Sequence, residues 1–437
     1  MILRLSINDD SYEHSLNLLA AADPVIQIDI QNKVLSILND IQKRQDQALL
    51  EYAQKYDGAT ATIPAELEIP REQIKQALAT LDPTLRQALK TAASRIRIYH
   101  QHQQRGLKAS DYQFKDENQN DFWQVTTPMD KVGLYVPGGK AFYPSSVLMN
   151  AIPAKVAGVQ DVIMAVPIGY TGQISPVVLA AASLAGVDRI FTMGGAQAIG
   201  AFAYGTETVP KVDKIVGPGN TYVALAKRAV FGRVGIDMIA GPSEILVLAD
   251  TSLSVDACVY DLFSQAEHDE AAQSILVSTD LKYLDQVAQR IPQLLKQQPR
   301  ADVIASALKS RGALIYVNTW QEAIDFSNKM APEHLELAFK EAEQYLPQVR
   351  HAGSVFVGVH TTESFGDYCA GPNHVLPTSG AARFSSPLGV ADFQKRTSFT
   401  RCSALGANAL APIAAALARA EHLEAHALAA ESRILKK

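Results

Sequence analysis

The chain has 437 residues, of which 47% are hydrophobic and 19% charged, and its formal net charge is −5. This length and composition indicate a globular protein of roughly three domains of about 150 residues each. The acidic balance argues against nucleic acid as the main partner, and no apolar run is long enough to predict a membrane span.

The first 130 residues are helical in pattern. Residues 1–25 are expected to form an amino-terminal extension, and they lack the sequence pattern of a signal peptide. Residues 31–57 carry apolar side chains at helical spacing, and Gly58 is a natural stop. The stretches REQIKQALATLD and PTLRQALKTAASRIRIYHQHQ predict two further helices, the second with Pro83 near its start.

From residue 131 onward, short apolar strands alternate with helical stretches. The predicted strands include KVGLYV, DVIMAVP, RIFTM and DKIVG, and the pattern resumes with EILVLAD, SILVST, ALIYVN and SVFVG. Such alternation is typical of βαβ units with a parallel sheet between layers of helices. We therefore expect an α/β fold with two Rossmann-like, doubly wound domains and helical extensions at both ends.

The last segment, about residues 401–435, is rich in alanine and is predicted to be helical. A helix of small residues at the end of an α/β core often docks on another surface, including that of a second subunit. The three cysteines, Cys258, Cys369 and Cys402, form neither a disulfide framework nor a CxxC metal motif. A reducing cytoplasm is the simplest expected location.

Three glycine-containing turns follow predicted strands: PGG (137–139), MGGAQ (193–197) and GPGN (217–220). Ligands of open α/β sheets bind beyond the carboxyl ends of the strands, beside helix amino termini. These turns, with Gln197 and Asn220, could therefore bind a nucleotide or phosphate. Tight strand-to-helix turns alone would also require glycine, and the chain contains neither GxGxxG nor a Walker GKS or GKT motif.

Polar residues that could bind a divalent metal are scattered through the second half of the chain. Gln265 and His268 in SQAEHDE are three apart, so on a helix they would share one face. Further candidates are Asp367, His374, Glu421 and His426. Zinc binds His and Asp readily. Their spacing nevertheless matches no compact zinc motif, and each residue would also suit an ordinary solvated surface.

The stretch APEHLEL (331–337) places Glu333 directly before His334, after a proline that ends the preceding helix. A neighbouring carboxylate and imidazole can transfer protons if both face a cleft. A charge pair at the end of a helix remains the alternative.

Several long motifs occur in one order from about residue 30 to the end of the chain. They are GLYVPGG, YPSSVLMNAIPAKVAG, GGAQAI, VPKVDKIVGPGN, IDMIAGPSEILVLAD, SQAEHD, APEHLEL, AGSVFVG, GDYCAGPNHVLPT, GVADFQKR and AEHLEAH. Together they resemble the histidinol dehydrogenase family. The resemblance implies oxidation of L-histidinol to L-histidine through L-histidinaldehyde with two NAD+, the last steps of histidine biosynthesis, and one zinc ion per subunit.

The resemblance also implies roles for individual residues. The zinc ligands would be Gln265, His268, Asp367 and His426, the last supplied across the interface of a homodimer. The catalytic residues would be Glu333, which activates water, and His334, which acts as the base. NAD would contact Tyr135, Gln197 and Asn220. The substrate would contact Ser243, Gln265, His268, Glu333, His334, Asp367, His374, Glu421 and His426.

The implied domains are an α/β domain with the metal and substrate site, formed by residues 26–130 and 243–385, and a Rossmann-like NAD-binding domain at 131–242. Residues 386–437 would form a helical dimerisation segment. No role follows for Cys369 or Cys402.

Other functions remain open at the level of the residues. A zinc hydrolase could use the same Glu–His pair without a redox cofactor, although the glycine turns speak against it. A non-catalytic binding protein with two α/β lobes would bind its ligand without metal. Paralogous dehydrogenases of other amino alcohols or diols are a further alternative, and manganese or cobalt could occupy a site with nitrogen and oxygen ligands.

Overall fold

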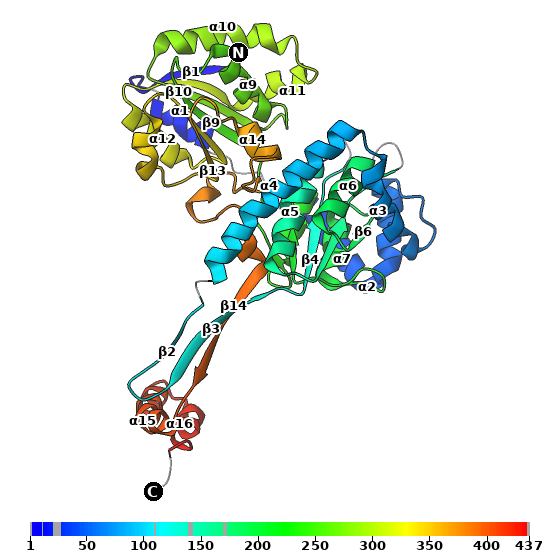
Figure 1. Ribbon diagram of the computed structural model, residues 1–437, viewed down its shortest axis with the longest axis vertical. Helices are drawn as coiled ribbons and strands as arrows, with labels where there is room; N and C mark the ends of the chain where they lie inside the picture. Colours follow the sequence, from blue (N-terminus) through cyan, green and yellow to red (C-terminus); the bar gives the residue numbers. More distant parts are fainter. Residues whose placement is uncertain are drawn as a thin grey trace.

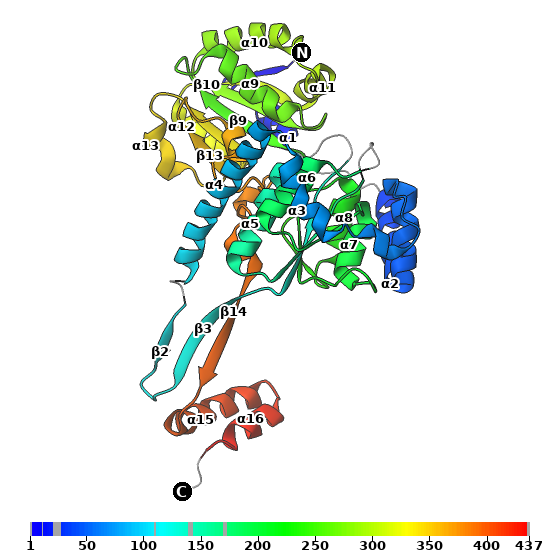
Figure 2. The same cartoon turned by 45° about the vertical axis from the view of Figure 1, so that its right-hand side comes forward.

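Two parallel β-sheets flanked by helices form the body of the molecule, and a long antiparallel arm projects from it (Figures 1 and 2). No helix in the described part of the chain has the length and apolarity needed to cross a membrane. The computed structural model describes residues 2–10, 12–20, 28–108, 111–138, 143–168 and 173–434.

The first sheet has five parallel strands in the order β6-β5-β4-β7-β8. Its strands are β4 (Lys131–Tyr135), β5 (Asp161–Ala165), β6 (Arg189–Phe191), β7 (Lys214–Val216) and β8 (Gly235–Ile236). The helices that alternate with them are α5 (Pro144–Ala157), α6 (Pro176–Ala185), α7 (Gly195–Tyr204) and α8 (Thr221–Val230). Helices α5 and α6 pack on one face and α7 and α8 on the other, which confirms the predicted βαβ alternation.

The second sheet has six parallel strands in the order β1-β11-β10-β9-β12-β13. Its strands are β1 (Leu3–Ser6), β9 (Glu244–Ala249), β10 (Gln273–Ser278), β11 (Gly312–Tyr316), β12 (His334–Ala338) and β13 (Ser354–Val357). Its helices are α1 (Tyr12–Ala20), α9 (Val255–Ala266), α10 (Leu281–Leu295), α11 (Ala301–Arg311), α12 (Trp320–Met330), α13 (Ala342–Tyr345) and α14 (Glu363–Tyr368). The fold is therefore α/β with two parallel sheets, as expected.

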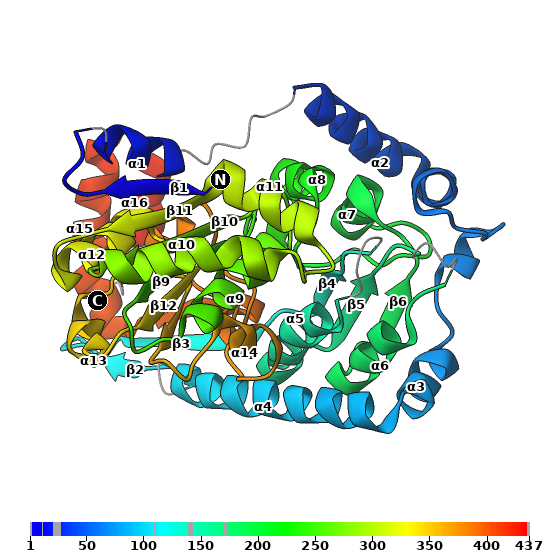
Figure 3. The ribbon, with the colours of Figure 1, turned by 90° about the horizontal axis from the view of Figure 1, so that it is seen from above.

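The helices between residues 28 and 108 pack beside the five-stranded sheet (Figure 3). Helix α2 (Ile28–Asp57) lies on α7 and α8, α3 (Arg71–Thr80) on α6, and α4 (Pro83–Lys108) on α5. This packing differs from the expected grouping of residues 26–130 with 243–385. The expected amino-terminal extension, in contrast, contributes β1 to the six-stranded sheet through its pairing with β11. The sequence pattern of an amphipathic helix predicts that one face is buried, but it does not predict on which sheet that face packs.

The arm is a three-stranded antiparallel sheet in the order β14-β3-β2, which ends in two helices far from the parallel sheets. It consists of β2 (Gln113–Lys115), β3 (Asp121–Pro128), β14 (Gln394–Arg401), α15 (Ala404–Ala420) and α16 (Glu424–Glu431). The prediction that the first 130 residues are helical is wrong for β1, β2 and β3. The prediction that residues 386–437 form a helical segment is wrong for β14. The residues of β2 are all exposed and β14 is exposed along most of its length, so neither strand shows the alternation of a half-buried strand.

Four short 3-10 helices occur within the described ranges. They are η1 (Pro64–Leu67), η2 (Leu346–Gln348), η3 (Ala381–Arg383) and η4 (Val390–Phe393).

Gly217, in the turn after β7, is expected to tolerate no side chain. Its φ is +113°, and a Cβ atom there would lie 2.0 Å from the backbone carbonyl oxygen of Tyr135. We expect Gly217→Ala to lower the free energy of unfolding by roughly 3 kcal/mol or more, because a steric clash with the backbone adds to the strain.

Gly232→Ala is the matched control for this prediction. Gly232 has φ +93° but no atom within 4 Å of the built Cβ, so only strain of about 1–2 kcal/mol is expected. Urea unfolding of both variants measures the difference, and equal losses would contradict the role assigned to the Tyr135 contact.

Candidate active site

His334 is the first residue of β12, and Glu333 directly precedes it, separated by two residues from Met330, the last residue of helix α12. Ala331, with φ +49°, ends that helix in the left-handed conformation. Both side chains of the pair are buried, and both contact the backbone of Glu244. The Glu244 N–H donates to Glu333 Oε2 at 2.8 Å, and the Glu244 carbonyl oxygen lies 2.9 Å from His334 Nδ1.

These contacts determine the tautomer of neutral His334. A carbonyl oxygen can only accept, so Nδ1 must carry the hydrogen and donate it. Nε2 then keeps its lone pair, and it is buried without a hydrogen-bond partner among the described residues. This is the arrangement of an imidazole that can take up a proton at Nε2.

The free nitrogen faces a group of carboxylates from α14. His334 Nε2 lies 3.7 Å from Asp367 Oδ1. Potential ligand atoms of His334, Glu363 and Asp367 all lie within 4.8 Å of one another. His374 lies beside this group, since its Nδ1 is 2.9 Å from the Asp367 carbonyl oxygen. Nitrogen and oxygen donors at this separation could hold a divalent cation.

Gln265 lies on the last turn of α9, whereas His268 lies beyond the end of the helix at Ala266. The expectation that both side chains share one helical face is therefore wrong, because His268 is not part of the helix. The turn is closed by the His268 N–H, which donates to the Gln265 carbonyl oxygen at 3.0 Å. His268 is exposed. Desolvation by its neighbours lowers its pKa, and this effect outweighs the negative charge of Asp367, which raises the pKa.

The Gln265 side chain lacks partners in the protein. It is completely buried, and neither its Oε1 nor its Nε2 atom has a hydrogen-bond partner in the described part of the chain. Each unsatisfied buried polar group costs about 1–3 kcal/mol. The buried, unpaired carboxamide oxygen therefore fits a group that binds from outside the chain, such as a metal ion or a polar substrate.

Burial and mutual charge perturb the pKa values throughout this site. Burial raises the pKa of Glu333 to about 8. Burial disfavours the imidazolium form of His334, but the charges of Glu333 and Asp367 outweigh it and raise the pKa of His334 to about 10. Burial also opposes ionisation of Asp367, yet His334 and His374 hold its pKa well below the usual range. The site thus stabilises positive charge next to Asp367.

A layer of polar residues behind the site fixes the position of α14. The Glu363 N–H donates to Glu336 Oε1 at 2.6 Å, and Ser264 Oγ donates to Glu363 Oε2 at 2.8 Å. Thr362 Oγ1 donates to Asp261 Oδ1 at 2.9 Å. Sequence reasoning missed Asp261, Glu336 and Glu363. Glu336 did carry a signal, because a carboxylate inside the apolar strand HLELA is rarely buried without a partner.

The loop after α14 connects this site to the five-stranded sheet and its helices. Asn373 Nδ2 donates to the Met149 carbonyl oxygen on α5 at 2.6 Å, and Arg95 Nε on α4 donates to the Cys369 carbonyl oxygen at 2.7 Å. The segment that carries Asp367 and His374 is therefore held against both α4 and α5.

The site lies at the amino-terminal edge of the six-stranded sheet. Ser243 directly precedes β9, and its carbonyl oxygen accepts the Gln273 N–H at the start of β10. Because β12 pairs with β9 so that His334 lies opposite Ile245, Ser243 and Glu244 come next to the Glu–His pair. The rule that ligands bind at carboxyl ends of strands does not describe this half of the molecule.

The expected nucleotide contacts lie at the carboxyl ends of strands in the five-stranded sheet. The chain order reverses between β4 and β7, which is where ligands of open α/β sheets bind. Tyr135 ends β4, and its hydroxyl oxygen accepts the N–H of Gly195, two residues before Gln197, at 3.3 Å. Asn220 caps α8 on the other side of the reversal, where its Oδ1 accepts the Val223 N–H.

The glycine turns are closely packed against other parts of the chain. Lys227 Nζ donates to the Gly217 carbonyl oxygen at 3.0 Å, and Asp237 Oδ2 accepts the Gly217 N–H at 2.8 Å. Lys227 and Asp237 also form a buried ion pair. Neither residue was anticipated from the sequence. Gly139, the last residue of PGG, lies outside the described residues.

Glu421 and His426 are not brought to this site within one chain. Glu421 follows α15 and His426 lies on α16, and both are exposed at the end of the arm, remote from α9 and α14 (Figures 1 and 2).

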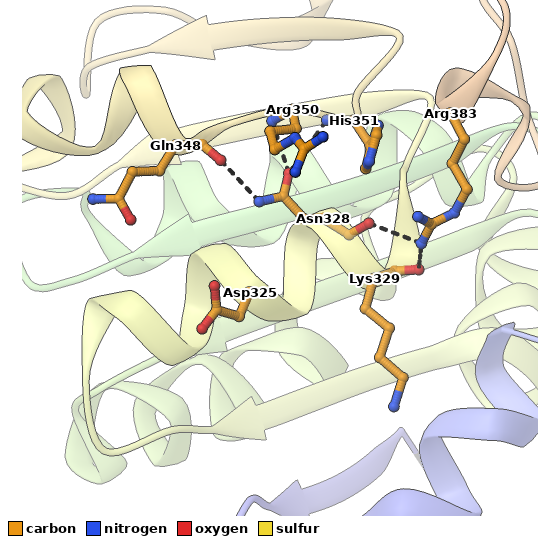
Figure 4. Close-up of a pocket in the computed structure, with 7 residues that line it drawn as sticks. All are labelled: Asp325, Asn328, Lys329, Gln348, Arg350, His351 and Arg383. Carbon is orange, nitrogen blue, oxygen red and sulfur yellow. Dashed lines mark hydrogen bonds between the residues drawn. The ribbon is translucent and has the colours of Figure 1, made fainter.

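A separate surface pocket of about 580 Å³ contains none of the expected site residues (Figure 4). Arg383 donates there to the carbonyl oxygens of Asn328 and Lys329. It thereby holds the end of α12 just before Glu333. The lining residues are Asp325, Asn328, Lys329, Gln348, Arg350, His351 and Arg383.

Comparison with known proteins gives one consistent result. The family model described as "Histidinol dehydrogenase" matches residues 23–434. Histidinol dehydrogenase of Pseudomonas fluorescens is 54% identical over 433 residues, 99% of this chain and 97% of its own length. That of Dechloromonas aromatica is 54% identical and covers 99% of both chains. The crystal structure of histidinol dehydrogenase from Elizabethkingia anophelis has a TM-score of 0.90 at 37% identity and covers 99% of this chain and 98% of its own.

Proposed function

The chain belongs to the histidinol dehydrogenase family and is an oxidoreductase of histidine biosynthesis, and we propose that it oxidises L-histidinol to L-histidine through L-histidinaldehyde with two NAD+ and zinc. The observation that carries this proposal is the free Nε2 of His334, which faces Asp367 near the centre of the site.

We assign the zinc ligands as Gln265, His268, Asp367 and, from a second copy of the chain, His426. Two observations support this assignment: the carboxamide of Gln265 is buried without a partner among the described residues, and the carboxylate of Asp367 is ionised. The bound ion would orient the amino alcohol and balance the carboxylate charge. Glu363 lies close enough to Asp367 to help hold the same cation.

His334 acts as the base in both oxidations. Its Nε2 takes the hydroxyl proton of the alcohol, and later that of the hydrated aldehyde. Bound NAD would supply the acceptor for the hydride that each oxidation removes from the same carbon. The Glu244 carbonyl oxygen keeps the ring in the required tautomer. The charge of a cation bound next to Asp367 would offset the negative charge of that carboxylate, which raises the His334 pKa. It would thereby lower the His334 pKa and favour the neutral imidazole closer to neutral pH.

Glu333 activates the water that adds to the aldehyde. Burial raises its pKa to about 8, so its carboxylate is a stronger base than an ordinary glutamate. The Glu244 N–H holds one of its oxygens in place. The remaining contacts to the substrate would come from Ser243, His268 and His374 of the same chain and from Glu421 of a second copy. The metal ligands and the catalytic pair would also contact the substrate.

NAD binds at the carboxyl edge of the five-stranded sheet, with Tyr135, Gln197 and Asn220 as contacts. Residues 131–242 are accordingly the NAD-binding domain, and residues 243–385 carry the metal and substrate site. We place the reaction in the cytoplasm, since Cys258, Cys369 and Cys402 are all free thiols.

The active unit is a homodimer formed through residues 386–437. Leu405, Ile413 and Leu417 on α15 are 58%, 58% and 63% exposed. A second copy that covers these side chains would remove apolar surface from water. Glu421 and His426 of that second copy would then lie at the active site of the first chain, which its own Glu421 and His426 do not reach.

Metal removal provides the test of this function. The protein incubated with L-histidinol and NAD+ is expected to form two NADH per histidine. Dialysis against a chelator should lower that rate by more than about a hundredfold, and added zinc should restore it. A hydrolase would form no NADH, and a metal-free protein with undiminished turnover would contradict the metal assignment. A panel of other amino alcohols tests the choice of substrate.

A further inference from the structure

Asn373 joins the loop that carries Asp367 and His374 to the helices of the other sheet. Its side chain is buried, and Nδ2 donates to the Met149 carbonyl oxygen on α5 at 2.6 Å. Its Oδ1 accepts the Val375 N–H at 2.9 Å. The carboxamide thus bonds both to its own loop and to α5, and it fixes the loop relative to a helix that lies 224 residues away in the sequence.

The acceptor on α5 is left free by the sequence of that helix. In an α-helix the Met149 carbonyl oxygen would accept the N–H of the residue four positions later. That residue is Pro153, which lies inside α5 and has no N–H to donate. The Asn373 amide takes the place of the missing donor, so the proline provides the acceptor to which the loop binds.

His100 on α4 is a second acceptor for the same amide. This imidazole is completely buried, and its Nδ1 lies 2.8 Å from the Ile96 carbonyl oxygen. Since a carbonyl oxygen can only accept, Nδ1 carries the hydrogen of the neutral ring and Nε2 keeps its lone pair. This Nε2 lies 3.4 Å from Asn373 Nδ2. The two hydrogens of the Asn373 amide therefore each have an acceptor, one on α4 and one on α5.

The backbone of the loop also lies directly on α4. Arg95 donates to the carbonyl oxygens of Cys369 at 2.7 Å and of Ala370 at 3.2 Å. Gly371 follows with φ +124°, and a Cβ atom there would lie 3.2 Å from the Arg95 carbonyl oxygen. These contacts lead the chain from α14 along α4 to Asn373, which ends this series of bonds with its side chain.

The position of Asn373 is transmitted to the active site by the next residue. His374 directly follows it, and His374 Nδ1 lies 2.9 Å from the Asp367 carbonyl oxygen. Asp367 Oδ1 in turn lies 3.7 Å from His334 Nε2. A displacement of Asn373 would therefore move His374 and, through it, Asp367 relative to His334.

We propose that Asn373 is a positioning residue, which locks the loop onto α4 and α5 and so determines where Asp367 and His374 meet the metal and the substrate. This inference rests on the proposed function, in which Asp367 is a zinc ligand and His374 contacts the substrate. Groups that hold metal ligands in place typically contribute about 10- to 100-fold to metal affinity.

Asn373→Asp removes the donor with little change in size. One carboxylate oxygen can still accept the Val375 N–H, but the other would face two acceptors, the Met149 carbonyl oxygen and His100 Nε2. We expect the dissociation constant for zinc, measured by competition with a chelating dye, to rise at least about tenfold. KM for L-histidinol should rise by a similar factor, while KM for NAD changes less than about twofold.

His100→Phe tests the contact to α4 and leaves the bond to Met149 in place. The phenyl ring fills the buried position but offers no acceptor, so the dissociation constant for zinc should rise about threefold, less than in Asn373→Asp. This variant also keeps the test decisive if Asn373→Asp does not fold. A folded His100→Phe protein with the zinc affinity and KM for L-histidinol of the wild type would then contradict the proposal.

Asn318→Asp is the matched control, because Asn318 is exposed beyond the carboxyl end of β11, where its side chain bonds to Asn8. It should leave zinc affinity and both KM values unchanged, and thermal unfolding shows which variants are folded. Wild-type protein that binds no zinc, or forms no NADH from L-histidinol, would overturn the proposed function. Normal wild-type zinc binding and turnover, together with unchanged zinc affinity and KM in Asn373→Asp, would overturn the role of Asn373 alone, even if that variant unfolded at a lower temperature.

Discussion

Replacement of His334 by glutamine is expected to lower kcat for NADH formation by about a thousandfold. The Gln side chain is close to histidine in length and its amide could still donate to the Glu244 carbonyl oxygen, as Nδ1 does at 2.9 Å. It cannot, however, provide a basic nitrogen in the place of Nε2. The substrate hydroxyl would then have to lose its proton without a base. Because the base acts in the chemical step, its removal should lower kcat more than it changes KM.

The pH profile gives a second measurement of the same role. A base must be deprotonated to act, so the wild-type rate should rise with pH until His334 has lost its proton. Without a cation the neighbouring carboxylates place the His334 pKa at about 10, and with zinc bound the rise should be complete at lower pH. The glutamine variant should lack this rise.

His351→Gln is a suitable control for that variant. His351 lines the separate surface pocket, where its backbone N–H is bonded to Asn328. Its replacement should leave kcat within twofold of wild type. A His334→Gln protein that retained more than a tenth of wild-type kcat would show that another group removes the proton.

The parallel sheets could be predicted from the sequence because their strands are apolar along their whole length. Strands such as EILVLA and the stretch SILVS are buried on both faces, and this makes them visible as short hydrophobic runs. The arm could not be predicted in the same way. Its strand QKRTSFTR is exposed along nearly its whole length, and its pairing with β3 is determined by residues more than 250 positions away.

The site shows the same division between local and distant information. The neighbouring residues Glu333 and His334 can be recognised as a pair in the sequence. Their hydrogen bonds to Glu244, about 90 positions earlier, are what determine the tautomer and the fixed carboxylate oxygen. Glu363 was missed for this reason, since it acquires its role only through His334, a partner from another element.

Replacement of Glu333 by glutamine is expected to separate the two oxidations. The Gln side chain can keep the hydrogen bond from the Glu244 N–H, now held at 2.8 Å by Glu333 Oε2, but it cannot accept a proton from water. Acid formation from L-histidinaldehyde should fall by about 10²- to 10³-fold. The first oxidation, for which His334 is the base, should remain within about tenfold of wild type.

The measurement for Glu333→Gln is the yield of NADH and histidine with L-histidinol and, separately, with L-histidinaldehyde as substrate. Because burial raises the Glu333 pKa to about 8, the rate of the acid-forming step should rise with pH through that value, and this dependence should disappear in the variant. Glu341→Gln, an exposed carboxylate beyond the other end of β12, should change neither step. If Glu333→Gln instead formed histidine from the aldehyde at the wild-type rate, the water would have to be activated by another group near Asp367.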